Sequence, residues 1–125
     1  MMKLSRTKFE KIVAEALDEL PDDICEALSN VYVVVEQWPS KEIIREMNMR
    51  SKHELLALYQ GIPLTNRNTH YGGAVLPDRI TVFQGPMQAM CSSLPELIDE
   101  IKRVVVHEIA HHFGIGEERL DELGY

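Results

Sequence analysis

The 125-residue chain has few cysteines, few basic residues and no long apolar run. Its two cysteines, Cys25 and Cys91, lie far apart, and the N-terminus has no apolar signal sequence, so we expect reduced thiols in a cytoplasmic protein. The longest apolar run is the five residues Val31–Val35, which excludes a membrane-spanning helix. Thirteen Lys and Arg stand against 20 Asp and Glu, a net charge of −7. This balance argues against nucleic acid and anionic membranes as partners.

The remaining composition is that of a folded protein. Apolar residues make up 45% and charged residues 26% of the chain, so there is enough apolar surface to form a core. The length suits one domain over residues 1–125 and leaves no room for a second core. No internal repeat or low-complexity stretch interrupts the sequence.

Local patterns predict helices and strands in alternation. A capping box at Thr7–Glu10 precedes apolar residues at helical spacing, and Ser40 is placed to cap a helix through Met47 that turns Ile43, Ile44 and Met47 inward. Residues 31–35 and 79–83 are predicted strands, and residues 87–91 a short helix. Residues 55–59 fit either strand or helix, and the polar, glycine-rich residues 66–73 predict a loop.

The longest predicted helix follows a second capping box, Ser93–Glu96. Apolar residues at helical spacing continue through Val105, and Gly114 is suited to end the helix because it tolerates a positive φ. The run Val104–Val106 alone would favour a strand, but the cap, the length and the period favour a buried helix. A short tail follows, with a possible helical turn over residues 117–123.

This helix carries the motif H-E-x-x-H at residues 107–111. Four residues advance a helix by slightly more than one turn, so His107 and His111 project from one face, at a spacing that suits two nitrogen ligands of one zinc ion. Glu108 lies beside them and is placed to accept a proton from metal-bound water. From this composition, chance gives the pattern in roughly 2 of 100 chains. The apolar helix around it favours a metal site over two incidental histidines.

A catalytic zinc needs a third protein ligand and one open position. Gly114 can turn the chain back, and Glu117 is then the first acidic side chain able to return to the metal. Glu118 and Asp121 remain alternatives. The extended pattern H-E-x-x-H-x-x-G-x-x-E matches the metzincin motif with Glu in place of its third His.

The other polar candidates have ordinary explanations. His112 points about 100° away from His111, which favours packing or support of the site over ligation. His53 and His70 are isolated, so solvated or loop positions are expected for both. Tyr125 and Arg119 are possible donors to a reacting carbonyl oxygen, although structural roles are favoured.

The chain resembles the small bacterial zincin-like metallopeptidases, which are minimal matrix-metalloprotease-like domains. The resemblance rests on residues 105–115, 118–120 and 123–125, together with residues 58–65 and 76–81. It implies an α+β, zincin-like fold in which a small mixed β-sheet packs on helices that include the HExxH helix. It also implies zinc at His107, His111 and an acidic third ligand. That ligand is usually Asp in this family, so Glu117 is a conservative departure.

The larger metzincins have a methionine turn beneath the zinc, and this chain has no Met after Met90. Leu120 and Leu123 are candidates for the base of the site instead. The sequence thus favours a zinc-dependent peptidase acting on a peptide or protein substrate, with the strand at residues 79–83 either an edge that pairs with substrate or an ordinary core strand. Two alternatives are a zinc-binding adaptor without hydrolytic function and a metal-free interaction domain.

Overall fold

The computed structural model describes residues 3–61 and 78–125. The predicted loop at residues 66–73 and His70 lie outside the described residues. In order along the chain, the elements are α1 (Arg6–Asp18), α2 (Asp22–Leu28), β1 (Val31–Glu36), α3 (Lys41–Glu46), β2 (Ala57–Gln60), β3 (Asp78–Phe83), α5 (Gln84–Met90), α6 (Leu94–Phe113) and α7 (Glu117–Leu123). The α+β class and the small mixed sheet are therefore confirmed. No helix within the described ranges is long and apolar enough to cross a membrane.

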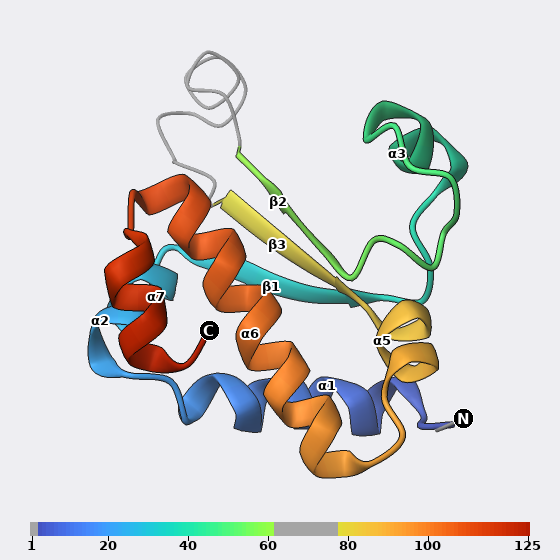
Figure 1. The fold of residues 1–125 in the computed structure, drawn as a ribbon. Coiled ribbons are helices and arrows are strands. Elements are labelled where there is room, and N and C mark those ends of the chain that lie inside the picture. The colour runs from blue at the N-terminus through green and yellow to red at the C-terminus, as the bar shows by residue number, and fades with distance from the viewer. Residues whose placement is uncertain (1–2, 62–77) are drawn as a thin grey trace, which may run out of the picture.

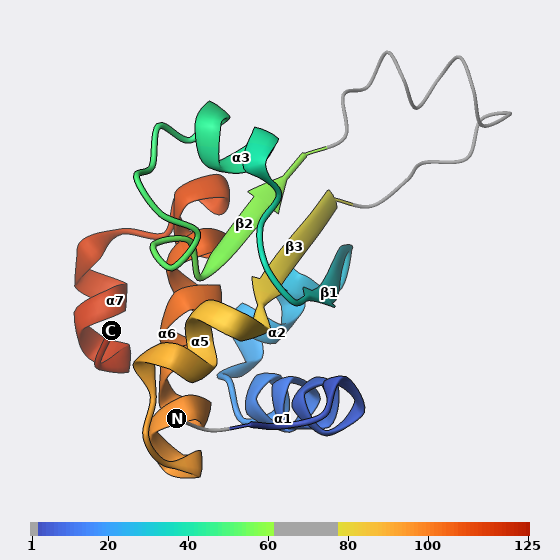
Figure 2. The ribbon, with the colours of Figure 1, turned by 90° about the vertical axis from the view of Figure 1, so that its right-hand side faces the viewer.

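The sheet has the order β1-β3-β2, with β1 parallel and β2 antiparallel to β3. Helices α1 and α6 cover one face, and α3 lies on the other side of the sheet (Figures 1 and 2). The core forms between the two covering helices and the sheet. Its members include Phe9, Ile12, Val35, Tyr59, Ile80, Val82, Ile101, Val105 and Ile109.

The strand order settles two open points of the sequence analysis. The ambiguous segment at residues 55–59 contributes β2, an antiparallel strand. The strand predicted at residues 79–83 is β3, which pairs with both neighbours and is the central strand. The hypothesis that it is an edge for substrate was therefore wrong, because its backbone groups are used by β1 and β2.

Three helices differ from expectation. The short helix predicted at residues 87–91 is α5, which begins three residues earlier, at Gln84, and ends at Met90. Helix α1 begins one residue before Thr7, because Ser5 is the N-cap and its hydroxyl accepts the N–H of Lys8 at 3.1 Å. Helix α3 is capped by Ser40 as predicted but ends at Glu46. The helix buries none of its residues: Ile43 and Ile44 are only partly buried, and Met47, its C-cap, is 43% exposed.

Helix α6 has the boundaries that its sequence signals predict. The Ser93 hydroxyl accepts the N–H of Glu96 at 3.3 Å, and Gly114 ends the helix in the left-handed conformation at φ 68°. Its apolar side is buried from Leu97 to Ala110. The helix is thereby fixed between α1, α2 and the sheet, and its last turn projects toward β2 and α7.

Gly85 in α5 is required by its contact with Trp38. A Cβ atom at this position would lie 2.4–2.6 Å from atoms of the indole ring. Gly85→Ala is therefore expected to displace Trp38 and lower the free energy of unfolding by about 1–3 kcal/mol. Urea unfolding followed by the fluorescence of this single tryptophan measures the effect. Gly61→Ala is the control, since its nearest neighbours are at 3.8 Å, and equal stability of the two variants would contradict the prediction.

Candidate active site

His107 and His111 lie one turn apart on α6 and line one cavity of about 100 Å³. Ala110, Ile115 and Leu120 form its apolar walls. Leu120 is buried and borders the cavity, as expected for the base of the site, whereas Leu123 packs in the neighbouring apolar cluster and does not border it. The motif therefore opens onto a small, partly apolar hollow between α6 and α7.

Glu117 reaches the same cavity because the chain reverses after α6. The left-handed Gly114 turns the backbone, and the Ile115 N–H bonds the Ala110 carbonyl at 3.2 Å. Glu117 then opens α7 and lines the cavity with the two histidines. The alternatives Glu118 and Asp121 are exposed and do not line it.

The donors suit zinc in chemistry, since two imidazoles and a carboxylate border one cavity and His₂Glu is a donor set of catalytic zinc sites. Within residues 3–61 and 78–125, no three His, Cys, Asp or Glu side chains are already arranged as a metal-holding group. One reason is visible at His107, whose Nε2 lies 3.1 Å from the backbone oxygen of Tyr125. Metal binding through that nitrogen requires the His107 ring and Tyr125 to separate.

Glu108 faces away from this cavity, toward the sheet. Its side chain is half-buried and lies toward β2, with the backbone N–H of Tyr59 near enough to its carboxylate to favour the charged form. Burial raises the pKa of the Glu108 carboxyl, and the charge of His112 and the Tyr59 N–H are the main opposing influences. The carboxylate is thus held at the contact between the motif helix and a strand.

The sequence analysis missed Tyr59 and Asp78. The Tyr59 ring stacks on His112 with centroids 3.9 Å apart and planes 14° apart, and its hydroxyl donates to Asp78 Oδ2 at 2.5 Å. The packing role expected for His112 is therefore confirmed. No pattern in the sequence connects Tyr59 to the helix that carries the motif, since Tyr59 and His112 are 53 positions apart. The second of the adjacent histidines, His112, was the available signal that this end of the helix makes a further contact.

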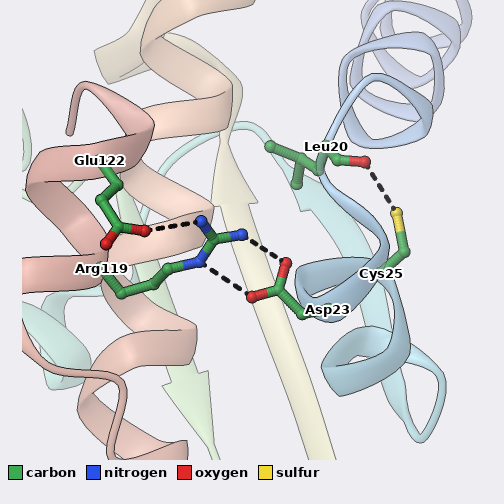
Figure 3. Close-up of polar contacts among 5 residues, drawn as sticks. All are labelled: Leu20, Asp23, Cys25, Arg119 and Glu122. Atoms are coloured by element: carbon green, nitrogen blue, oxygen red, sulfur yellow. Dashed lines mark hydrogen bonds and ion pairs between the residues drawn. The ribbon is translucent and has the colours of Figure 1, made fainter.

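Arg119 and Tyr125 have structural contacts. Figure 3 shows the Arg119 guanidinium between Asp23 of α2 and Glu122 of α7, with nitrogens 2.8 and 3.0 Å from the two Asp23 oxygens. This guanidinium holds the pKa of Asp23 below its usual value. Tyr125 packs against the apolar cluster of α2, α6 and α7. These contacts fasten α7, and with it Glu117, to the body of the protein.

The remaining candidates have no place in the site. Both cysteines are free thiols; Cys25 lies near the Leu20 carbonyl at 3.4 Å (Figure 3), and Cys91 is buried. Burial raises the pKa of the Cys91 thiol, which disfavours its reactive form. His53 is exposed beside Trp38, with ring centroids 4.9 Å apart.

Comparison with known proteins gives one finding. Residues 28–125 match the family of zincin-like metallopeptidases. The match covers most of the chain and all of α6 and α7. A search of the curated proteins finds no match.

Proposed function

Because the chain belongs to the zincin-like metallopeptidase family, we propose that it hydrolyses peptide bonds with zinc held by His107, His111 and Glu117 and with Glu108 as general base. The observation that carries the proposal is the shared cavity: two histidines one turn apart and one carboxylate border the same hollow at the end of α6. Glu108 follows His107 directly and stands three residues before His111, so it is a neighbour of both histidines on the helix.

The three proposed metal ligands come from two different helices. His107 and His111 come from a buried, rigid helix, whereas Glu117 comes from the first residue of α7, which the Arg119–Asp23 pair fastens. When bound, zinc would supply a Lewis acid and a water molecule that loses a proton near neutral pH.

Glu108 would move the proton in this mechanism. Its carboxylate would accept the proton of the attacking water and would later return that proton to the leaving amine. To act, the carboxylate turns from the Tyr59 N–H toward the cavity, a rotation about its own side-chain bonds.

An extended peptide would pair with the outer edge of β2. Phe83 donates its N–H to the Leu56 carbonyl, so alternate residues from Leu56 onward face β3. Tyr59 belongs to the other set, and its N–H points to Glu108. The backbone edge beside the general base is therefore the edge of β2 that faces away from β3, so a substrate along it would lie next to Glu108.

A zinc-binding adaptor without hydrolytic function is the alternative. A structural zinc site is closed by four protein ligands. Among the described residues that border the cavity, only His107, His111 and Glu117 carry metal-binding side chains. Three is the number of protein ligands that a catalytic zinc site takes, which supports the peptidase.

The metal content of purified protein tests the ligand set. Elemental analysis at neutral pH is expected to give about one zinc per chain for the wild type. Glu117→Ala is expected to weaken zinc binding by more than about 100-fold, because loss of supporting groups alone costs roughly 10- to 100-fold. Glu118→Ala and Asp121→Ala are matched controls that remove a neighbouring carboxylate and should retain zinc.

Full zinc retention in Glu117→Ala would show that Glu117 is not a ligand. Loss of zinc in Glu118→Ala or Asp121→Ala alone would move the assignment to that residue. A wild type without zinc, even after zinc is added, would contradict the metal site itself and return the histidines to an incidental role.

A further inference from the structure

Tyr59 is the point at which β2 contacts the end of the motif helix. Its ring is 8% exposed and stacks on His112, and Phe113 meets it edge-on with centroids 6.3 Å apart. The hydroxyl is bonded to Asp78, the first residue of β3. The ring is thus held from the helix on one side and from the sheet at its tip.

The motif helix has two chemically distinct faces. His107 and His111, four residues apart, border the cavity toward α7. Glu108 and His112, also four residues apart, face β2, where one meets the backbone N–H of Tyr59 and the other its ring. A single residue of β2 therefore contacts both members of the second face.

The apolar packing of α6 does not reach its last turn. The buried residues of the helix end at Ala110, and Phe113 is 48% exposed. Beyond Ala110, two ring contacts join this turn to Tyr59 of β2. The stacked pair thus sets the separation between the end of α6 and the edge of β2.

We propose that Tyr59 and His112 are positioning residues for the proton transfer: their stacked rings hold Glu108 beside the edge of β2 along which the substrate lies. The inference rests on the proposed peptidase function. It assigns His112 a role through its flat ring and gives it no part in metal binding. An aromatic ring without nitrogen should therefore replace it, and a small side chain should not.

The test compares His112→Ala with His112→Phe. Hydrogen exchange of the Tyr59 amide, followed by NMR on the zinc-loaded protein, reports whether Glu108 still holds that N–H. We expect exchange at Tyr59 to accelerate by about 10-fold or more in His112→Ala and to stay at the wild-type rate in His112→Phe. The amide of Ile109, inside α6, should be unchanged in both, which separates positioning from general loosening of the helix.

The rate of peptide cleavage is the second readout. The substrate is a fluorogenic peptide chosen from a random library because the wild-type protein cleaves it. In His112→Ala, kcat is expected to fall by about 10- to 100-fold with KM nearly constant and one zinc retained, because a small misplacement of a catalytic group costs up to about 100-fold. Phe113→Ala, which removes only the edge-on contact, is the matched control and should have the smaller effect.

Unchanged Tyr59 exchange in His112→Ala, or a His112→Phe variant as impaired as the alanine variant, would overturn the inference. So would an unchanged kcat in His112→Ala when the wild type is active. A wild type that binds zinc but cleaves no library peptide would instead overturn the proposed function, and with it the catalytic role of the stacked pair.

Discussion

Glu108→Gln is expected to lower the rate of peptide hydrolysis by about 10²- to 10⁴-fold while one zinc per chain remains bound. Glutamine has nearly the same size and can still accept the Tyr59 N–H through its amide oxygen. It cannot take a proton from water at neutral pH. The substitution thus removes the proton transfer and leaves the contact between α6 and β2 in place.

The rate is measured by mass spectrometry of a peptide mixture, and the zinc content by elemental analysis of the same samples. Glu118→Gln is the matched control, because Glu118 is exposed on α7 and does not border the cavity. The midpoint temperature of thermal unfolding of Glu108→Gln should be unchanged or slightly higher than that of the wild type, since the variant no longer buries a carboxylate. Undiminished cleavage with zinc retained would exclude Glu108 as the general base.

The features that the sequence predicted correctly are those with local signals. Helix α6 begins after its N-cap Ser93 and ends at Gly114, so the residues that set each boundary stand at that boundary in the sequence. The shared face of His107 and His111 follows from helix geometry alone, and Glu117 reaches the same cavity after a short turn at Gly114, while their roles as zinc ligands stay predictions. In each case the determining residues are neighbours in the chain.

The features that it missed depend on contacts between distant segments. Whether β3 is central or an edge is decided by the order of three strands, and no residue of β3 encodes that order. Tyr59 lies in a four-residue strand that its own sequence leaves ambiguous, and its partner Glu108 is on α6. Ser5 and Thr7 are both residue types that suit an N-cap, and the structure uses Ser5.

The family match begins at residue 28, so α1 lies outside it, yet α1 supplies part of the core beneath the motif helix. Phe9 is fully buried and packs in the cluster that includes Ile101, Val105 and Ile109 of α6. Loss of α1 packing would therefore be felt by the helix that carries His107 and His111. The site depends on a segment that the family match does not cover.

Phe9→Ala is accordingly expected to lower the free energy of unfolding by about 3–5 kcal/mol, the usual cost of emptying a buried phenylalanine site. Small domains have about 5–15 kcal/mol in total, so the variant should be close to unfolding without metal. Urea unfolding followed by far-UV circular dichroism measures the loss, and Lys11→Ala, exposed on the same helix, should change it by less than about 0.5 kcal/mol. Zinc should restore part of the stability, because a ligand that binds only the folded state favours it. A loss below about 1 kcal/mol in Phe9→Ala would show that α1 is peripheral and that the matched region holds the motif helix without it.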